Sequence, residues 1–204
     1  MSQMVLRMGR TDWLAGQFLY IVVASLVYTV WLALSCILVL IPQVSFANEW
    51  GRILYALATE RGLSAQCGVV LSLSEGMLDL MKPSNAMMLS ICLTWLVSIF
   101  FGVSMMCANI LIDRRAGYVV GGCFAFFSYF SAYLGPIIFG SGILWYSPAS
   151  WISIYAFDWF GDPGRPNCAS IILILIAAIL VLFGVSMYTF CKRDMDIRQE
   201  GILS

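Results

Sequence analysis

The side chains that could do chemistry in this chain are seven cysteines together with serines, threonines and carboxylates, because the sequence contains no histidine. The lack of histidine excludes Ser-His and Cys-His catalysis and histidine-based metal sites. The sequence also has no C-x-x-C pair and no G-x-x-x-x-G-K-[ST] loop for nucleotide phosphates. We therefore expect a protein that is not an enzyme, with no catalytic residue, no metal and no cofactor.

The cysteines differ in their surroundings. Four lie inside long apolar runs, where cysteine behaves as a small apolar residue: Cys36, Cys92, Cys107 and Cys123. Cys191 stands directly before Lys192, so in a eukaryotic host it is a hypothetical palmitoylation site. Cys67 and Cys168 fall outside the apolar runs. In an oxidising compartment these two could form a disulfide, and otherwise they remain thiols.

The elements that must position these side chains are the apolar runs. Hydrophobic residues make up 61% of the 204 positions and charged residues 11%, against roughly 25% charged in a typical soluble domain. A helix that crosses a bilayer needs about 20 apolar residues. Four runs without an internal charge reach that length: 17–41, 86–111, 117–139 and 169–190. The sequence therefore predicts an all-α, polytopic membrane protein with one domain and four transmembrane helices, in contact with lipid and with no nucleic-acid partner.

The positions of the cations predict the orientation. With the N-terminus in the cytoplasm, the inner segments hold seven cations: Arg7, Arg10, Arg114, Arg115, Lys192, Arg193 and Arg198. The longer outer loops, 42–85 and 140–168, hold four: Arg52, Arg61, Lys82 and Arg165. Cytoplasmic segments carry the excess of Lys and Arg. We therefore expect both ends in the cytoplasm, and we expect the host membrane to be the bacterial cytoplasmic membrane.

Two of the predicted spans carry seams of small residues, which allow close helix packing in lipid. The seam of the third span comprises Gly121, Ala125, Ser128, Ala132 and Gly135. The shorter seam of the second span comprises Thr94, Ser98 and Gly102. We interpret these seams as helix–helix or subunit contacts; the alternative is that they are ordinary small residues of membrane helices. Gly135-Pro136 should kink or end the third span, because proline removes a backbone donor.

Short helices are expected in the two outer loops. In loop 140–168, Ser147-Pro148 is a typical helix start, so we expect a short aromatic helix in the outer interface, or dipping into it, with an aromatic-rich surface loop as the alternative. In loop 42–85, apolar residues at helical spacing predict an amphipathic helix: Trp50, Ile53, Leu54, Leu57 and Ala58. A second short helix is predicted over Ser74–Lys82.

Three motifs resemble one transporter family. They are Trp13-Leu14-Ala15-Gly16-Gln17 before the first span, Ser147-Pro148-Ala149-Ser150-Trp151 in the last outer loop, and Tyr188-Thr-Phe-Cys-Lys-Arg-Asp194 at the end of the last span. Together they resemble the ABC-2-type permeases, the membrane subunits of ATP-binding-cassette exporters. The resemblance covers the last four of the six spans that are usual in this family.

The resemblance implies a function as half of a dimeric export pathway, with ATP hydrolysed by a separate subunit. It also implies that the segment before the first span docks on that ATPase. By position, the docking candidates are Arg7, Arg10, Thr11, Asp12 and Trp13, with Arg114 and Arg115 of the second inner loop as further contacts. Assembly into a homo- or hetero-oligomer with other membrane chains is expected on the same basis.

Two other functions remain open from the residues alone. One is a non-catalytic, four-span accessory or scaffold subunit, which would bind another membrane protein through the seams and the long outer loop. The other is a channel-like assembly, for which polar residues should line a pore at several depths, and such residues are sparse in the spans. The identity of co-purifying chains separates these functions from the permease function.

Overall fold

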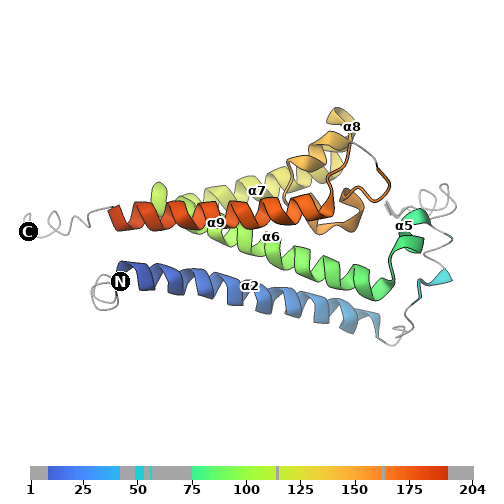
Figure 1. Ribbon diagram of the computed structural model, residues 1–204, viewed down its shortest axis with the longest axis horizontal. Helices are drawn as coiled ribbons and strands as arrows, with labels where there is room; N and C mark the ends of the chain where they lie inside the picture. The colour runs from blue at the N-terminus through green and yellow to red at the C-terminus, as the bar shows by residue number, and fades with distance from the viewer. Residues whose placement is uncertain are drawn as a thin grey trace, which may run out of the picture.

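Three helices in the structure are long and apolar enough to cross a membrane: α2 (Arg10–Leu40), α6 (Pro83–Leu111) and α9 (Cys168–Lys192). A fourth apolar helix, α7 (Ala116–Tyr133), is shorter. The computed structural model describes residues 9–41, 49–52, 56, 75–113, 115–161 and 164–192, and every regular element in these ranges is helical (Figure 1). The all-helical class and the apolar helices agree with the prediction from composition.

The helices overlie the predicted runs but differ from them at their ends. α2 begins at Arg10 rather than at residue 17, so Thr11, Asp12 and Trp13 lie in its first turn. The apolar run is shorter than the helix because a helix can continue through polar residues, and an acidic side chain in the first turn interacts favourably with the helix dipole. α6 has Pro83 at its first position, where the missing N–H costs no helical hydrogen bond.

The third run is interrupted close to its end. α7 ends at Tyr133, Leu134 forms a turn, and α8 (Gly135–Phe139) follows directly. The proline after Gly135 has no N–H to donate to the preceding turn, which is the physical reason for the break. The backbone N–H of Ile138 donates to the Leu134 carbonyl at 3.2 Å, so helical bonding resumes at once. The predicted kink is confirmed.

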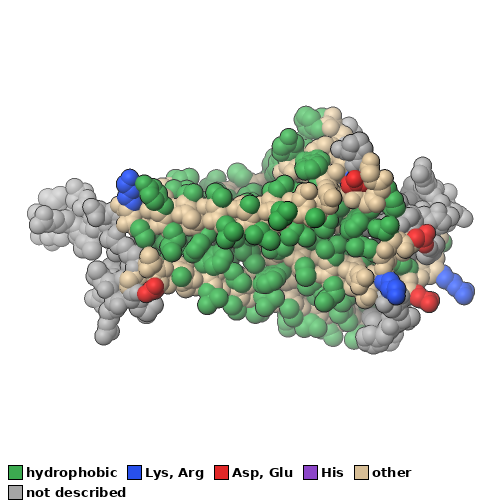
Figure 2. All heavy atoms as spheres, viewed as in Figure 1, with side chains coloured by type: hydrophobic (Ala, Val, Ile, Leu, Met, Phe, Trp, Pro, Cys, Tyr) green, Lys and Arg blue, Asp and Glu red, His purple; other side chains and the backbone are tan. Residues whose placement is uncertain are grey.

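α6 is the centre of the bundle. α2, α7 and α9 each pack against it, and α2 also contacts α9 (Figure 1). The buried side chains of α9 recur at helical spacing, and Ile171, Leu175 and Ile179 pack in the same clusters as buried residues of α6. The outward surface is largely apolar, and the charged side chains gather at the two ends of the bundle (Figure 2). Such a surface suits contact with lipid along its length.

The aromatic segment between α8 and α9 does not form the α-helix expected from Ser147. It forms three short 3₁₀ helices: η1 (Ser141–Trp145), η2 (Ser150–Ile152) and η3 (Ile154–Ala156). The segment is not a surface loop either, because η2 and η3 pack on α6, and η2 also packs on α7.

Burial of two rings explains this conformation. Trp151 and Phe157 are both buried in one cluster with residues of α6 and α9: Leu93, Val97, Ile171 and Leu175. On an α-helix, two residues six positions apart point about 120° away from each other, so one straight helix could not bury both in the same cluster. The backbone instead becomes extended at Ser153 and at Phe157, which lets both rings enter the core.

In the first outer loop, α5 (Glu75–Leu80) falls within the second predicted helix, Ser74–Lys82. The indole N–H of Trp50 donates to the Met81 carbonyl at 2.7 Å, so the start of this loop is tied to its end. Most of the predicted amphipathic helix, including Ile53, Leu54, Leu57 and Ala58, lies outside the described residues.

Truncation of Trp151 should destabilise the bundle much more than truncation of Trp145. Trp151 is 6% exposed, and its indole donates to the Leu144 carbonyl at 2.7 Å, whereas Trp145 is 39% exposed. Loss of a buried tryptophan costs about 3–5 kcal/mol, which corresponds to roughly 10 °C in a chain of this size. We expect Trp151→Ala to lower the unfolding midpoint in mild detergent by that amount. Trp145→Ala is the matched control, and equal shifts for the two variants would show that η2 is not part of the core.

Candidate functional site

The candidate docking residues at the start of α2 lie beside the end of α9. The rings of Trp13 and Phe190 are stacked, with centroids 5.2 Å apart and an interplanar angle of 17°. Thr11 and Asp12, which precede Trp13 in the same first turn of α2, are exposed. Figure 1 places the first residues of α2 and the last residues of α9 at the same end of the bundle, here named the inner end.

A second ring pair fixes α2 to α9 deeper in the bundle. Phe18 and Phe183 have centroids 4.5 Å apart, and Leu14 between the two pairs is fully buried. Trp13 is half-buried because it stacks on Phe190. Its ring therefore packs within the chain, and less of it is available to a partner. Among the docking candidates whose side chains the structure describes on this helix, Thr11 and Asp12 are exposed and can contact a partner.

The turn between α6 and α7 also lies at the inner end and is held by one side chain. The backbone N–H of Gly117 donates to Oδ1 of Asn109 at 2.7 Å, and the Ala116 N–H donates to the Asp113 carbonyl at 3.0 Å. Arg115 is exposed at the start of α7. This short turn therefore presents a cation beside two rigid helix ends.

The side chains of three predicted docking residues are outside the described part of the chain. Arg7 and Arg114 lie outside the described residues, and for Arg10 the structure gives the position in α2 but not the side chain. The described docking candidates that come together at the inner end are Thr11, Asp12, Trp13 and Arg115 (Figure 1).

The seam of the second span contributes one close helix contact. A Cβ added at Gly102 would lie 2.6 Å from a methyl carbon of Ile21, so this glycine lets α2 approach α6. Thr94 donates to the Ser90 carbonyl of its own helix at 2.7 Å, and Ser98 is half-buried.

The seam of the third span divides between two neighbours. Gly121 lies against the Met105 side chain of α6, and Gly135 lies against Ile143 of η1. Ser128 donates to the carbonyl of Phe124 in its own helix at 2.5 Å, and Ala125 is exposed. The side chain of Ala132 is outside the described residues. The residues of this seam therefore do not share one partner.

A cluster of three buried serines joins α7 to the aromatic segment. The Ser131 hydroxyl lies 2.5 Å from the Ser147 hydroxyl and 3.3 Å from the Ser150 hydroxyl. The Ser150 N–H donates to the Ser147 carbonyl at 3.0 Å and to the Ser147 hydroxyl at 3.4 Å, so Ser147 begins a tight turn that leads into η2, where the sequence predicted the start of a longer helix. With every hydroxyl bonded inside the cluster, its function is to fix the segment on α7.

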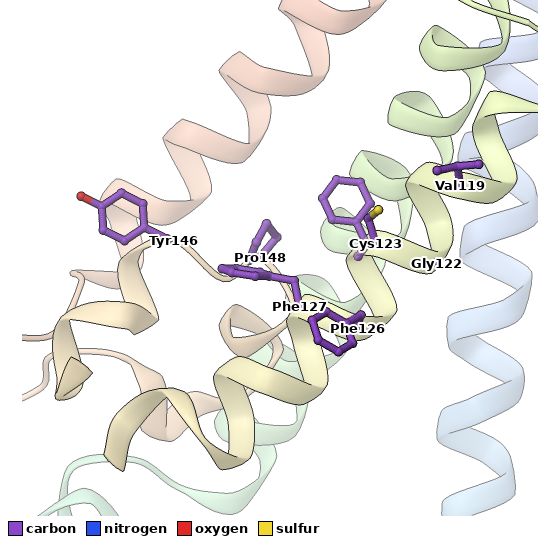
Figure 3. Close-up of a pocket in the computed structure, with 8 residues that line it drawn as sticks. Val119, Gly122, Cys123, Phe126, Phe127, Tyr146 and Pro148 are labelled. Atoms are coloured by element: carbon purple, nitrogen blue, oxygen red, sulfur yellow. The ribbon is translucent and has the colours of Figure 1, made fainter. Parts of the chain in front are cut away.

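An open apolar groove of about 760 Å³ runs along α7 on the surface of the bundle (Figure 3). It is lined by Val119, Gly122, Cys123, Phe124, Phe126 and Phe127 of α7, and by Tyr146 and Pro148 of the aromatic segment. Its lining suits acyl chains or a neighbouring apolar helix rather than a polar solute.

No three His, Cys, Asp or Glu side chains lie close enough to hold a metal ion in the described part of the chain. Each buried side-chain nitrogen or oxygen there has a hydrogen-bond partner. Cys168 is half-buried at the start of α9, while Cys67 lies outside the described residues, so their pairing stays a prediction.

Sequence reasoning missed three contributors to these contacts. Ser131 was hidden beside the small-residue seam, three positions after Ser128. Phe190 belongs to the aromatic stretch Tyr188–Asp194, but its pairing with Trp13 joins residues far apart in the chain. Asn109 is a polar residue at the end of its predicted span. That position was the sequence feature that could have indicated its hydrogen bond to Gly117.

Comparison of the chain with protein-family models, with curated proteins and with solved structures finds no match. The resemblance to ABC-2-type permeases rests on the motifs quoted above.

Substitution of Gly117 should destabilise the inner turn, although alanine normally favours a helix. A Cβ at Gly117 would lie 2.7 Å from both polar atoms of the Asn109 amide, so the amide must move and leave the Gly117 N–H unbonded. An unsatisfied buried donor costs about 1–3 kcal/mol, more than the gain of roughly 0.8–1 kcal/mol from removing a helical glycine. We expect Gly117→Ala to lower the unfolding midpoint in mild detergent.

Gly122→Ala is the matched control, because an added Cβ there meets nothing within 4 Å and the helix gain should raise the midpoint. Combining Gly117→Ala with Asn109→Ala separates the two causes. A penalty for Gly117→Ala that persists unchanged without the Asn109 amide would contradict this account.

Proposed function

We propose that this chain is a four-span protein of the bacterial cytoplasmic membrane, with both ends in the cytoplasm. The direction of the helices supports this: α2 and α7 run away from the inner end, and α6 and α9 run back to it (Figure 1). α7 has 18 residues, which give about 27 Å at 1.5 Å each, close to the hydrocarbon thickness. Its continuation in α8 supplies the remaining length.

We further propose that the chain is the permease subunit of an ATP-binding-cassette exporter, energised by a separate ATPase subunit. The observation that carries this proposal is the convergence at the inner end of the docking candidates of α2 with the α6–α7 turn. Thr11, Asp12 and Arg115 are exposed there, on elements that are fixed to the bundle by the Trp13–Phe190 stack and the Asn109–Gly117 hydrogen bond.

An ATPase can move the transmembrane helices only if the polar segments that it contacts are firmly attached to those helices. A partner that moves the start of α2 also moves α9 through the two ring pairs, since rigid helices shift as bodies. The movement reaches α6 through Gly102 against Ile21, and through the indole of Trp95, which donates to the Val22 carbonyl at 3.2 Å. The inner end is therefore mechanically connected to the whole bundle.

Two observations favour the accessory or scaffold function instead. Trp13, the largest of the candidate docking residues, is already stacked on Phe190 and half-buried. The groove on α7 is apolar and open, as a contact surface for another membrane protein would be.

The four-span topology predicts where reporters become active. Green fluorescent protein fused after Ser204 should fluoresce, and alkaline phosphatase at the same place should be inactive, because that end is cytoplasmic. Alkaline phosphatase fused after Gly140, beyond α8, should be active. If α7 does not cross the membrane, all three results are reversed, since three crossings place the end of α9 outside and Gly140 inside.

The permease function predicts that an ATP-binding subunit co-purifies with the chain in mild detergent and is stimulated by it. Arg10→Glu and Arg115→Glu should each reduce this stimulation roughly tenfold, because reversing a charge in a polar interface costs more than about 1.4 kcal/mol. The measurement is ATP hydrolysis by the co-reconstituted subunits as a function of permease concentration.

Lys82→Glu is the matched control, because it reverses an exposed charge at the opposite end of the bundle. Trp13→Ala should reduce both the stimulation and the unfolding midpoint, whereas Trp13→Phe keeps a ring against Phe190 and should restore the midpoint. Co-purification of a membrane partner without any ATPase would favour the accessory function. Full stimulation by both arginine variants would overturn the docking surface.

A further inference from the structure

Two hollows on the surface of the bundle meet at Tyr146. The first is the groove of about 760 Å³ described above, here named the α7 groove, which Tyr146 and Pro148 border on the side of the aromatic segment. The second, here named the outer hollow, has a volume of about 390 Å³ and is lined by Gly142, Trp145, Tyr146 and Gly164. Because both hollows contain Tyr146, a single elongated molecule can occupy the two together.

The α7 groove lies at the depth of the hydrocarbon core. Its α7 residues, Val119 to Phe127, extend over about 12 Å of a helix that crosses from the inner end. Ser147, the neighbour of Pro148, is bonded to Ser131 in the outer part of α7, so the aromatic segment borders the groove there. The outer hollow includes residues just beyond α8 and just before α9, and it is therefore the part nearer to the outer headgroups.

The outer hollow offers hydrogen-bonding groups that the described chain does not use. Trp145 and Tyr146 are 39% and 77% exposed. Within the described residues, no hydrogen bond reaches the Trp145 indole N–H or the Tyr146 hydroxyl. The Tyr146 hydroxyl points away from the labelled residues of α7, so its ring borders the α7 groove while its polar group faces away from it (Figure 3). An indole only donates and a phenol also donates, so the outer hollow suits a group rich in acceptors.

Neither hollow has a charged side chain among the described residues that line it. The sequence from residue 116 to residue 157 contains no Asp, Glu, Lys or Arg. An occupant is therefore held by apolar contact in the α7 groove and by hydrogen bonds in the outer hollow, without an ion pair.

The paired hollows favour a lipid over a neighbouring helix. A transmembrane helix could cover the α7 groove, but its backbone carbonyls are bonded within the helix, so it brings few acceptors to Trp145 and Tyr146. A glycerophospholipid has apolar chains, and its ester and phosphate oxygens are acceptors at the headgroup level. Its two parts thus match the two hollows in order of depth.

We propose that the α7 groove and the outer hollow together bind one glycerophospholipid of the outer leaflet. One acyl chain lies along α7 past Phe127 and Cys123 toward Val119. The ester or phosphate oxygens accept hydrogen bonds from the Trp145 indole and the Tyr146 hydroxyl. This site does not rest on the ATPase proposal, because none of its residues lies at the inner end.

Titration of the delipidated chain with phosphatidylglycerol in mild detergent, read by native mass spectrometry, tests the site. We expect one lipid to bind before all others, and a gradual uptake without a distinct first lipid would overturn the proposal. Phosphatidylcholine with the same chains should bind within about threefold, since hydrogen bonds to phosphate do not require a net charge. A much stronger binding of phosphatidylglycerol would overturn recognition without an ion pair.

Gly122→Leu tests the chain site. Gly122 is exposed in the α7 groove and an added Cβ meets nothing within 4 Å, so the leucine side chain takes space that the acyl chain would fill. We expect the affinity for the first lipid to fall roughly tenfold through lost apolar contact. The unfolding midpoint of the lipid-free chain should not fall, because leucine favours the helix more than glycine.

Gly184→Leu is the matched control, since Gly184 is an exposed glycine of α9, outside both hollows, with nothing within 4 Å of an added Cβ. It should leave the affinity unchanged, and equal losses in the two variants would overturn the α7 groove as the chain site.

Trp145→Phe and Tyr146→Phe test the headgroup contacts. Each should weaken the first lipid about threefold, through the loss of one hydrogen bond. Tyr118→Phe, which changes an exposed tyrosine at the start of α7, is the control and should change nothing. Full affinity in both outer-hollow variants would overturn the outer hollow as the headgroup site.

Photocrosslinking identifies the occupant directly. p-Benzoylphenylalanine in place of Phe126, which lines the α7 groove, should give a phospholipid adduct when it is irradiated after extraction in mild detergent. The same group in place of Val181, an exposed residue of α9, should give none, because freely exchanging lipid is washed away. If irradiation in the membrane instead joins position 126 to a second copy or to another protein, the lipid is not the occupant and the proposal is overturned.

Discussion

Polar groups inside this bundle have to find hydrogen-bond partners in the protein, because neither lipid nor a dry core can supply them. The serine cluster and the indole of Trp151 follow this constraint at one end of the bundle, and the N–H of buried Gly117 follows it at the other by donating to Asn109. In each case, a short polar contact decides where an otherwise apolar segment sits. Apolar packing alone would allow many arrangements of these helices, since leucine and lipid tails are equally apolar. The hydrogen bonds select one of them.

α6 is the helix on which the other long helices pack. It meets α2 at Gly102, α7 at Met105, and the aromatic segment and α9 at Leu93 and Val97. Each neighbour therefore takes its position from the same helix, and α2 and α9 also contact each other through two ring pairs. A displacement of α6 would therefore reach each of the helices that pack on it. This property is shared by both functions considered for the chain.

The all-helical class and the places of the long apolar helices could be predicted from the sequence, because run length and the lack of charge are local properties. The break after Leu134 was predictable for the same reason, since proline acts on its own turn. The burial of Trp151 with Phe157 was not predictable, because it depends on α6 and α9 forming a cleft between them. The Trp13 pair with Phe190 was hidden likewise, since no periodicity connects the first helix with the last. Within the inner end, the sequence could indicate which polar residues gather, but not which of them remain exposed.

The Trp13–Phe190 stack also orders events during biogenesis. At about 5–20 residues per second, the ribosome finishes the end of α9 roughly 10–35 s after the start of α2 has emerged. Throughout that interval the inner end of α2 lacks its ring partner, and of the two long helices that pack on α2 in the described chain, α6 alone is already made. Final closure of the bundle is therefore a late event, and any assembly factor that recognises the unclosed end has this interval in which to act.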